Sequence, residues 1–232
     1  MITPIESLRK RPYPRPKDWK KSDNIKELSI RDKVNEVVFD LMFTATPPLR
    51  AMIDIGFGRE RQGEVLGREG EDTQIGIDSS AEILEKKILI QSARKHGLSL
   101  FVFSEHNHLR VARPEVIATL DPIDNSGEYE AGLNTPPYIA IGFFDRKGVP
   151  IAGAVSNLLT GHIFVNRVGK NYEYNPNTRQ LIQLPPPRKI ETIKDPDFVL
   201  VSYDGKYKYT GPFRANFDRF DRERNQNRVF HG

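Results

Sequence analysis

Cysteine is absent from this 232-residue sequence, and tryptophan occurs once, at Trp19. Without cysteine the chain has no disulfide framework, no thiolate metal site and no thiol nucleophile, and nothing indicates an oxidising compartment. Long apolar runs are also missing, since the most apolar stretches, such as residues 138–144, fall far short of the ~20 residues that a membrane-spanning helix needs. The N-terminus is charged, contains prolines and lacks the apolar segment of a secretory signal. We therefore expect a soluble cytoplasmic protein.

Positive charge is concentrated at the N-terminus. Residues 1–26 hold eight Lys or Arg against three acids, whereas the formal net charge of the whole chain is only +4. The remainder is therefore nearly neutral. Prolines at positions 12, 14 and 16 favour an extended basic arm over residues 1–28, either solvated or packed on the body. An alternative is that this arm binds RNA or another polyanion, with Tyr13 and Trp19 stacking on bases.

Two segments are predicted to be helices. Ser29 followed by Asp32 resembles an N-cap, and apolar residues then recur at helical spacing, which predicts an amphipathic helix that is disturbed at Pro47-Pro48. Residues 56–76 are rich in glycine and charge and favour turns, a hairpin or a mobile loop. The second helix is predicted to begin with N-cap oxygens at residues 78–80 and to stop at Gly97.

Beyond Gly97 the pattern changes to strands. Apolar or alternating runs, separated by turns at 145–148 and 160–161, predict strands over residues 98–103, 116–120, 138–144, 151–157, 162–166, 168–174, 179–183 and 198–202. The segment 213–232 is polar and at best a weak helix. We expect an α/β layered fold, in which two N-terminal helices cover a mostly antiparallel sheet within residues 29–205, followed by a charged tail over 206–232.

Carboxylates cluster at the ends of two predicted strands. Asp121 and Asp124 flank a rigid proline in what reads as a tight turn after a strand, so both side chains and the carbonyl of Ile123 could face one pocket. Such oxygen ligands suit Mg²⁺, although the same residue types are also ordinary turn formers. Glu105 ends the preceding strand, and two neighbouring parallel strands would bring all three acids to one sheet edge. Burying three uncompensated carboxylates is costly, which favours a cation site.

The ordered motifs resemble the inositol monophosphatase superfamily, which includes inositol monophosphatases, fructose-1,6-bisphosphatases and 3'(2'),5'-bisphosphate nucleotidases. Residues 121–126 match the signature Asp-Pro-(Ile/Leu)-Asp-Gly-(Thr/Ser), and residues 104–106 match its upstream acidic element. Residues 78–82 match an Asp-x-x-x-Glu at the start of a helix. The central sheet of the family resembles residues 136–142, 152–155, 161–164 and 169. The likeness spans roughly residues 30–205.

The resemblance implies a metal-dependent phosphomonoesterase acting on a small sugar, inositol or nucleotide phosphate through metal-activated water. Glu105, Asp121 and the Ile123 carbonyl would hold one Mg²⁺, and Asp121 would bridge to a second ion also held by Asp124. The position of Asp78 implies a role beside the nucleophilic water or a third, weaker ion. Two or three ions would thus be bound, with Mn²⁺ as an alternative metal.

The remaining roles implied by the resemblance concern the water and the phosphate. Ser126, paired with Glu105, would orient the attacking water. The phosphate would contact Asp124 and the backbone N–H groups of Asn125 and Ser126. Asn125 stands where the family has glycine, which is tolerable because asparagine suits left-handed backbone conformations.

Two further departures from the family pattern leave alternatives open. His106 replaces an acid and, with His108, could favour Mn²⁺ or Zn²⁺, although a solvent-facing or hydrogen-bonded histidine pair is the preferred explanation. The family's C-terminal Trp-Asp-x-Ala metal motif is missing, and 217–218 and 220–221 (both Phe-Asp) are only approximations. We therefore expect the C-terminal α/β layers to be missing or reduced, which would expose one sheet face to self-association or to a partner. The alternative function is a weak or inactive remnant that binds phosphate, a partner or RNA.

Overall fold

The computed structural model describes residues 10–17, 19, 28–56, 65–69, 72–104, 108–130, 135–167, 169–186, 200–202 and 229–231. The chain divides into two units, residues 1–185 and 186–232. In the second unit, β10 (Leu200–Ser202) pairs in parallel with β11 (Val229–His231). The weak helix predicted for the tail is therefore wrong at 229–231, because backbone pairing with β10 outweighs a marginal helix propensity.

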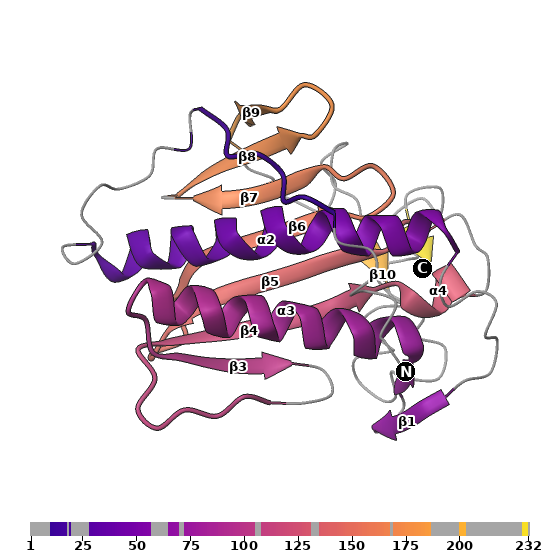
Figure 1. The fold of residues 1–232 in the computed structure, drawn as a ribbon, viewed down its shortest axis with the longest axis horizontal. Helices are drawn as coiled ribbons and strands as arrows, with labels where there is room; N and C mark the ends of the chain where they lie inside the picture. Colours follow the sequence, from indigo (N-terminus) through magenta and orange to yellow (C-terminus); the bar gives the residue numbers. More distant parts are fainter. Residues whose placement is uncertain are drawn as a thin grey trace. The chain divides into compact units, whose positions relative to one another are not determined.

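The first unit has a layer of two helices on one face of a seven-stranded sheet (Figure 1). Helix α2 (Ile30–Asp54) packs against α3 (Gly76–Lys95) and the central strands. From edge to edge the sheet consists of β3 (Leu100–Ser104), β4 (Val116–Asp124), β5 (Tyr138–Asp145), β6 (Pro150–Asn157), β7 (Ile163–Arg167), β8 (Lys170–Asn175) and β9 (Gln180–Gln183). Strands β3 and β4 are parallel and every other pair is antiparallel, so the expected fold class is confirmed.

Two smaller elements complete the described part of this unit. The hairpin of β1 (Val65–Glu69) and β2 (Asp72–Ile75) realises one of the alternatives predicted for residues 56–76. The short helix α4 (Ser126–Glu130) follows β4. None of the helices in the described part of the chain has the length and apolar character needed to cross a membrane.

Helix α2 continues through the two prolines that were expected to disturb it. Pro47 cannot donate a backbone hydrogen bond to the carbonyl four residues earlier, which belongs to Phe43. That carbonyl instead accepts a hydrogen bond from the backbone N–H of Tyr13, at 2.8 Å. The N–H of Tyr13 thus supplies the hydrogen bond that Pro47 cannot donate to the carbonyl of Phe43. Burial of the helix against the sheet keeps it continuous.

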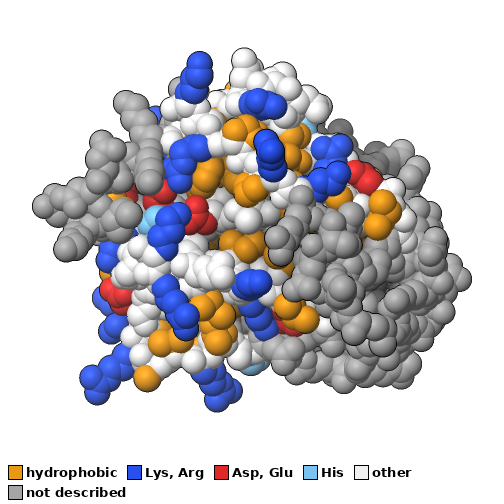
Figure 2. Space-filling view, in the orientation of Figure 1, with side chains coloured by type: hydrophobic (Ala, Val, Ile, Leu, Met, Phe, Trp, Pro, Cys, Tyr) orange, Lys and Arg blue, Asp and Glu red, His pale blue; other side chains and the backbone are white. Residues whose placement is uncertain are grey.

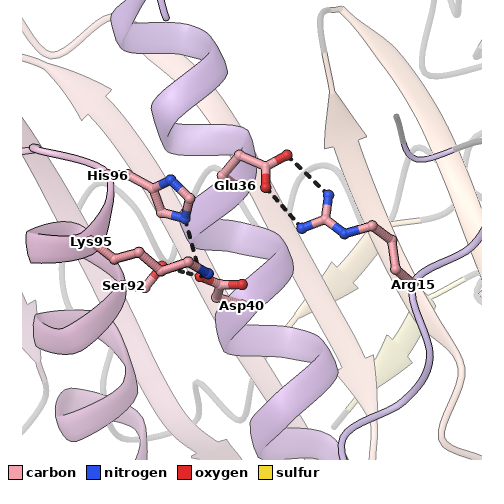
Figure 3. A network of polar contacts seen from close by, with 6 residues as sticks. All are labelled: Arg15, Glu36, Asp40, Ser92, Lys95 and His96. Atoms are coloured by element: carbon pink, nitrogen blue, oxygen red, sulfur yellow. Dashed lines mark hydrogen bonds and ion pairs between the residues drawn. The ribbon is translucent and has the colours of Figure 1, made fainter. Parts of the chain in front are cut away.

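Residues 10–19 contact α2 through both aromatic and ionic groups. Trp19 is 1% exposed and packs against Phe39 and Phe43. Arg15 forms a two-pronged ion pair with Glu36, at 2.8 and 3.1 Å (Figure 3). The guanidinium of Arg15 also lies over the ring of Phe39, 3.9 Å from its centroid. Tyr13 and Trp19, the two aromatic residues considered for stacking on bases, therefore pack within the unit.

Lysine and arginine side chains on the face seen in Figure 2 are spread among apolar and uncharged ones. Among the described residues of that face they do not gather into one patch. Affinity for a polyanion depends on several cations contacting neighbouring phosphates. This described surface therefore adds no support for a polyanion site.

A polar cluster joins α2 to α3 (Figure 3). The carboxylate of Asp40 accepts hydrogen bonds from Ser92 Oγ at 2.7 Å and Lys95 Nζ at 2.8 Å, and His96 Nε2 lies 3.2 Å away. Burial alone would raise the pKa of Asp40, but the contacts from Lys95, Ser92 and His96 outweigh it and hold that pKa below its ordinary value. The ionised form of Asp40 therefore stabilises the helix pair.

Asp40→Asn is expected to lower the free energy of unfolding by about 1–2 kcal/mol at neutral pH, allowing for partial exposure of the carboxylate. The pKa of Asp40 is lower in the folded chain, so its contribution is present at neutral pH and is lost as pH falls below about 3.8. Urea unfolding at pH 7 and at pH 3 measures both effects. Asp54→Asn, an exposed acid at the end of the same helix, is the matched control and should change stability little. An equal loss in both variants would contradict this prediction.

Helix α3 begins at Gly76, before the N-cap residues that its sequence indicated. Residues 78–80, expected as N-cap residues, lie inside the helix, because it starts at Gly76 directly after β2. The predicted end is confirmed. Gly97 has φ +60, and the N–H of Leu98 bonds to the carbonyl of Ala93, which is the hydrogen-bond pattern of a glycine-terminated helix.

Candidate functional site

The parallel pair β3 and β4 ends at one sheet edge. Ser104, the last residue of β3, pairs with Leu120 of β4, and β4 continues beyond this pair to Asp124. Glu105 and His106 lie outside the described residues, and the role predicted for Glu105 stays a prediction. The chain returns along β3, where Val102 and Leu109 exchange two backbone hydrogen bonds of 2.9 and 3.0 Å.

Asp121 and Asp124 lie within β4 and not in a tight turn after it, which corrects the sequence prediction. Asp121 pairs with Ala140 and Asp124 with Tyr138, with an irregularity in the register between them. Because pairing with β5 resumes after this bulge, the strand extends to Asp124. Both acids are half-buried, while Ile123 is 3% exposed.

A left-handed residue joins β4 to α4. Asn125 has φ +65, which confirms that asparagine can take the conformation otherwise favoured by glycine. Its side-chain Nδ2 donates to the carbonyl of Pro136 at 3.3 Å, and its own carbonyl accepts from the N–H of Tyr129 at 3.0 Å. Helix α4 then opens at Ser126. The first N–H groups of a helix have no partner within it, so they are the groups that could contact an anion.

Three acids follow one face of α3 at spacings of four and three residues. Asp78 and Glu82 are each 3% exposed, and Glu85 is fully buried. Glu82 accepts a hydrogen bond from Ser104 Oγ. It also forms an ion pair with Lys86, whose Nζ lies 2.8 Å from Glu82 Oε1. Glu82 therefore ties the helix to the end of β3, next to the edge where β4 carries its acids.

Glu85 is the residue that sequence reasoning missed. Both of its carboxylate oxygens are buried and have no hydrogen-bond partner among the residues that the structure describes. Burial raises the pKa of Glu85 well above its ordinary value, and the charges of Asp121, Glu82 and Asp78 raise it further. Acids of α3 and β4 thus act on one another electrostatically. The seven-residue spacing from Asp78 was the available signal, because it places both acids on one helix face.

The donor chemistry suits a hard cation, but the described side chains do not form a ready-made metal site. No group of three or more His, Asp or Glu residues among them has a metal-holding arrangement. Carboxylate and carbonyl oxygens are the ligands that Mg²⁺ prefers, and a buried acid beside other acids is stabilised by a nearby cation. His108 stacks on Phe103, with ring centroids 4.1 Å apart, which is an ordinary packing role.

An open hollow of about 760 Å³ extends over the sheet from β3 to β8 and is lined by Phe103, Thr119, Asp121, Gly142 and Gly153, among others. Asp121 therefore borders a cavity large enough for a small phosphorylated molecule.

Comparison with known proteins gives matches in structure only. No protein-family model matches the chain, and no curated protein sequence matches it. The chain is similar to fructose-1,6-bisphosphatase of Leishmania major in its holo form, with a TM-score of 0.60 and 13% identity over 93% of this chain and 70% of that one. It is also similar to the extragenic suppressor protein SuhB of Bartonella henselae (TM-score 0.58, 16% identity, 84% and 68% coverage). Inositol monophosphatase-II of Staphylococcus aureus gives a TM-score of 0.55, 13% identity, and 85% and 65% coverage.

These matches show the fold. The chain has the layered fold found in inositol monophosphatase and fructose-1,6-bisphosphatase structures, as its motifs led us to expect. It spans 65–70% of the length of the three structures named.

Proposed function

We propose that this chain is a Mg²⁺-dependent phosphomonoesterase for a small sugar, inositol or nucleotide phosphate. The observation that carries the proposal is the convergence of buried acids from α3 with Asp121 of β4, in a fold shared with phosphatases. A structural role alone does not account for Glu85, because an unpartnered buried acid among other acids costs stability. Sites that perform chemistry commonly retain such costs.

The proposed ion ligands are chosen for their oxygen atoms and for their match to the motifs of the inositol monophosphatase superfamily. Asp121, Asp124, the carbonyl of Ile123 and Glu105 would hold Mg²⁺, with two or three ions in all and Mn²⁺ as an alternative. When bound, such an ion supplies positive charge for the phosphate oxygens and lowers the pKa of a water. Asp121 would be central to this set because it borders the hollow and also acts on Glu85.

The other residues would bind and orient the reactants. The positive φ of Asn125 turns the backbone sharply before Ser126, so that successive N–H groups could contact a phosphate, with Asp124 beside it. The hydroxyl of Ser126, with Glu105, would orient the attacking water. Asp78 is held at 3% exposure in the first turn of α3, where it would position the water or a further ion.

A second candidate function is a remnant of low activity that binds a phosphate, a partner or RNA. The observation that favours it is the lack of a ready-made metal cluster among the described residues. The Phe-Asp pairs at 217–218 and 220–221, which approximate the family's C-terminal metal motif, lie outside the described residues. The two functions predict different responses to Mg²⁺.

Phosphate release from inositol monophosphate, fructose 1,6-bisphosphate and adenosine 3',5'-bisphosphate distinguishes them. We expect release from at least one substrate that rises with Mg²⁺, is supported by Mn²⁺ and stops in EDTA. A parallel thermal melt should show that Mg²⁺ raises the melting temperature, because cation binding relieves repulsion among the acids. Absence of metal-dependent release with every substrate, together with an unchanged melting temperature, would favour the remnant.

A further inference from the structure

A second hollow, of about 480 Å³, lies between the N-terminal segment and the turn that joins β8 to β9. Residues 14–17 form one of its walls and residues 178–180 form the other. Its charged lining residues are Arg15, Lys17 and Arg179, and none of its described lining residues is an acid. This basic hollow shares none of its described lining residues with the larger hollow on the sheet, so the two are separate sites.

Both walls of the basic hollow are fixed by packing within the first unit. Tyr13, which precedes the first wall, contacts the ring of Tyr174 near the end of β8, with 5.7 Å between the ring centroids. A Cβ added at Gly161 would approach Tyr13 Oη to 2.5 Å and Pro176 Cγ to 3.2 Å, so these two side chains meet at the same glycine. A ligand would therefore enter a preformed site, which lowers the entropic cost of binding.

Arg15 is held in position in the first wall. Its Nη1 and Nη2 each donate to a carboxylate oxygen of Glu36 (Figure 3). A guanidinium has five N–H donors, so donors remain for a ligand after the two bonds to Glu36. Lys17 and Arg179 are exposed and have no acidic partner among the residues that the structure describes. Their charges are therefore not neutralised by the described part of the chain.

Arg179 has a backbone conformation that is costly for a residue with a side chain. Its φ is +59, in the left-handed region that glycine favours. The turn fixes this conformation, because the N–H of Arg179 bonds to the carbonyl of Asn175 at 2.8 Å, and Asn175 Oδ1 accepts the N–H groups of Asn177 and Thr178 at 2.9 and 3.3 Å. An arginine at such a strained position suggests that its side chain has a use.

We propose that the basic hollow binds a small anion with two or more negative charges, such as a phosphorylated metabolite, between Arg15, Lys17 and Arg179. Hydrogen bonds from arginine to phosphate oxygens are about twice as strong as neutral ones. The volume lies within the range of about 300–1,000 Å³ that is typical of small-molecule pockets. A long polyanion needs cations spread along its phosphates, whereas these three converge on one hollow, which favours a small ligand.

The bound anion would join the N-terminal segment to the β8–β9 turn, because it would contact both walls at once. Binding to the folded chain alone stabilises it by mass action. The site uses no metal and none of the acids assigned to catalysis. It is therefore independent of the proposed phosphatase activity.

Thermal melting of the full chain in EDTA, with inorganic pyrophosphate as the probe, tests the site. Pyrophosphate should raise the melting temperature of the wild type by several degrees, and KCl at the same ionic strength should not. Lys17→Ala and Arg179→Gly should each need about 10-fold more pyrophosphate for the same rise, because each loses one charge-assisted contact. The proposal is overturned if pyrophosphate causes no rise, if KCl reproduces the rise, or if either variant responds like the wild type.

Further variants separate a lost contact from a damaged fold or a general charge effect. Glycine adopts φ +59 without strain, so Arg179→Gly without pyrophosphate should melt close to the wild type. Arg179→Lys keeps the charge and should keep most of the response. Lys147→Ala is the matched control, because Lys147 is an exposed lysine in the β5–β6 turn, at the opposite end of the sheet; it should respond like the wild type.

A response that Lys147→Ala weakens as much as Lys17→Ala does would show a general effect of charge and would contradict the site. Loss of the response in Arg179→Lys, together with a lower melting temperature without pyrophosphate, would show a structural role for Arg179 instead. The assay contains no free metal and measures no catalysis. Failure of the phosphatase proposal would therefore leave its result intact.

Discussion

Asp121→Asn is expected to abolish Mg²⁺-dependent phosphate release, with a loss of at least about 100-fold in kcat/KM. Loss of residues that merely support metal ligands already costs about 10–100-fold, and a bridging ligand should cost more. The asparagine keeps the shape of the side chain but removes the charge that also acts on Glu85. The measurement is phosphate release at saturating Mg²⁺ with the best substrate of the panel.

Two controls separate a lost ligand from a damaged fold. Asp54→Asn makes the same chemical change at an exposed site on α2 and should retain full activity. The melting temperature of Asp121→Asn without metal should equal or exceed that of the wild type, because one source of repulsion is gone. Its response to Mg²⁺ should be smaller. Retained activity, or an unchanged Mg²⁺ response, would show that Asp121 is not an ion ligand.

Glu85→Met is expected to raise the free energy of unfolding at pH 7 by about 1–3 kcal/mol, measured in EDTA. Methionine fills a similar volume and removes a fully buried polar group whose oxygens have no hydrogen-bond partner. For a chain of this length each kcal/mol corresponds to about 2–4 °C in melting temperature. The same variant should lose activity if Glu85 supports the ion site, which would be a trade of function against stability.

The stabilisation should grow with pH. Because the pKa of Glu85 is raised in the folded chain, its protonated form is favoured there, and wild-type stability falls as pH rises above the ordinary value of 4.5. The methionine variant lacks this titration, so its advantage should be small at pH 4 and larger at pH 8. Glu85→Gln, which removes the charge but keeps a polar group, should show the same pH trend with a smaller gain. A gain independent of pH would contradict a buried ionisable carboxyl.

Local chemistry made several elements predictable. The turn at 145–148 forms because Asp145 Oδ1 accepts the N–H groups of Lys147 and Val149, both at 2.8 Å, and because Gly148 adopts φ +79. Strands β5 to β7 were found because buried residues alternate along each of them. Continuation of α2 through Pro47 was not predictable. The carbonyl of Phe43, which Pro47 leaves without a helical donor, accepts a hydrogen bond from the N–H of Tyr13, 30 residues before Phe43 in the sequence.

The sequence predicted only part of the candidate site. Asp121, Asp124 and the left-handed Asn125 could be identified because their residue types and order carry the chemistry within six positions. The spacing of Glu85 from Asp78 places both acids on one helix face, but no pattern in the sequence marked Glu85 as a buried residue. An acid on a helix is ordinarily solvated, and only the packing of α3 against β4 buries this one without a hydrogen-bond partner.

The sequence by itself determined the two long helices, most of the strand order and the fold class, because these depend on periodicity and on neighbours along the chain. Only the tertiary structure decided which acids share one electrostatic environment, which backbone N–H group replaces a lost helical donor, and which side chains line the hollow of the sheet. Each of these depends on distances between segments far apart in sequence, which a linear pattern does not encode.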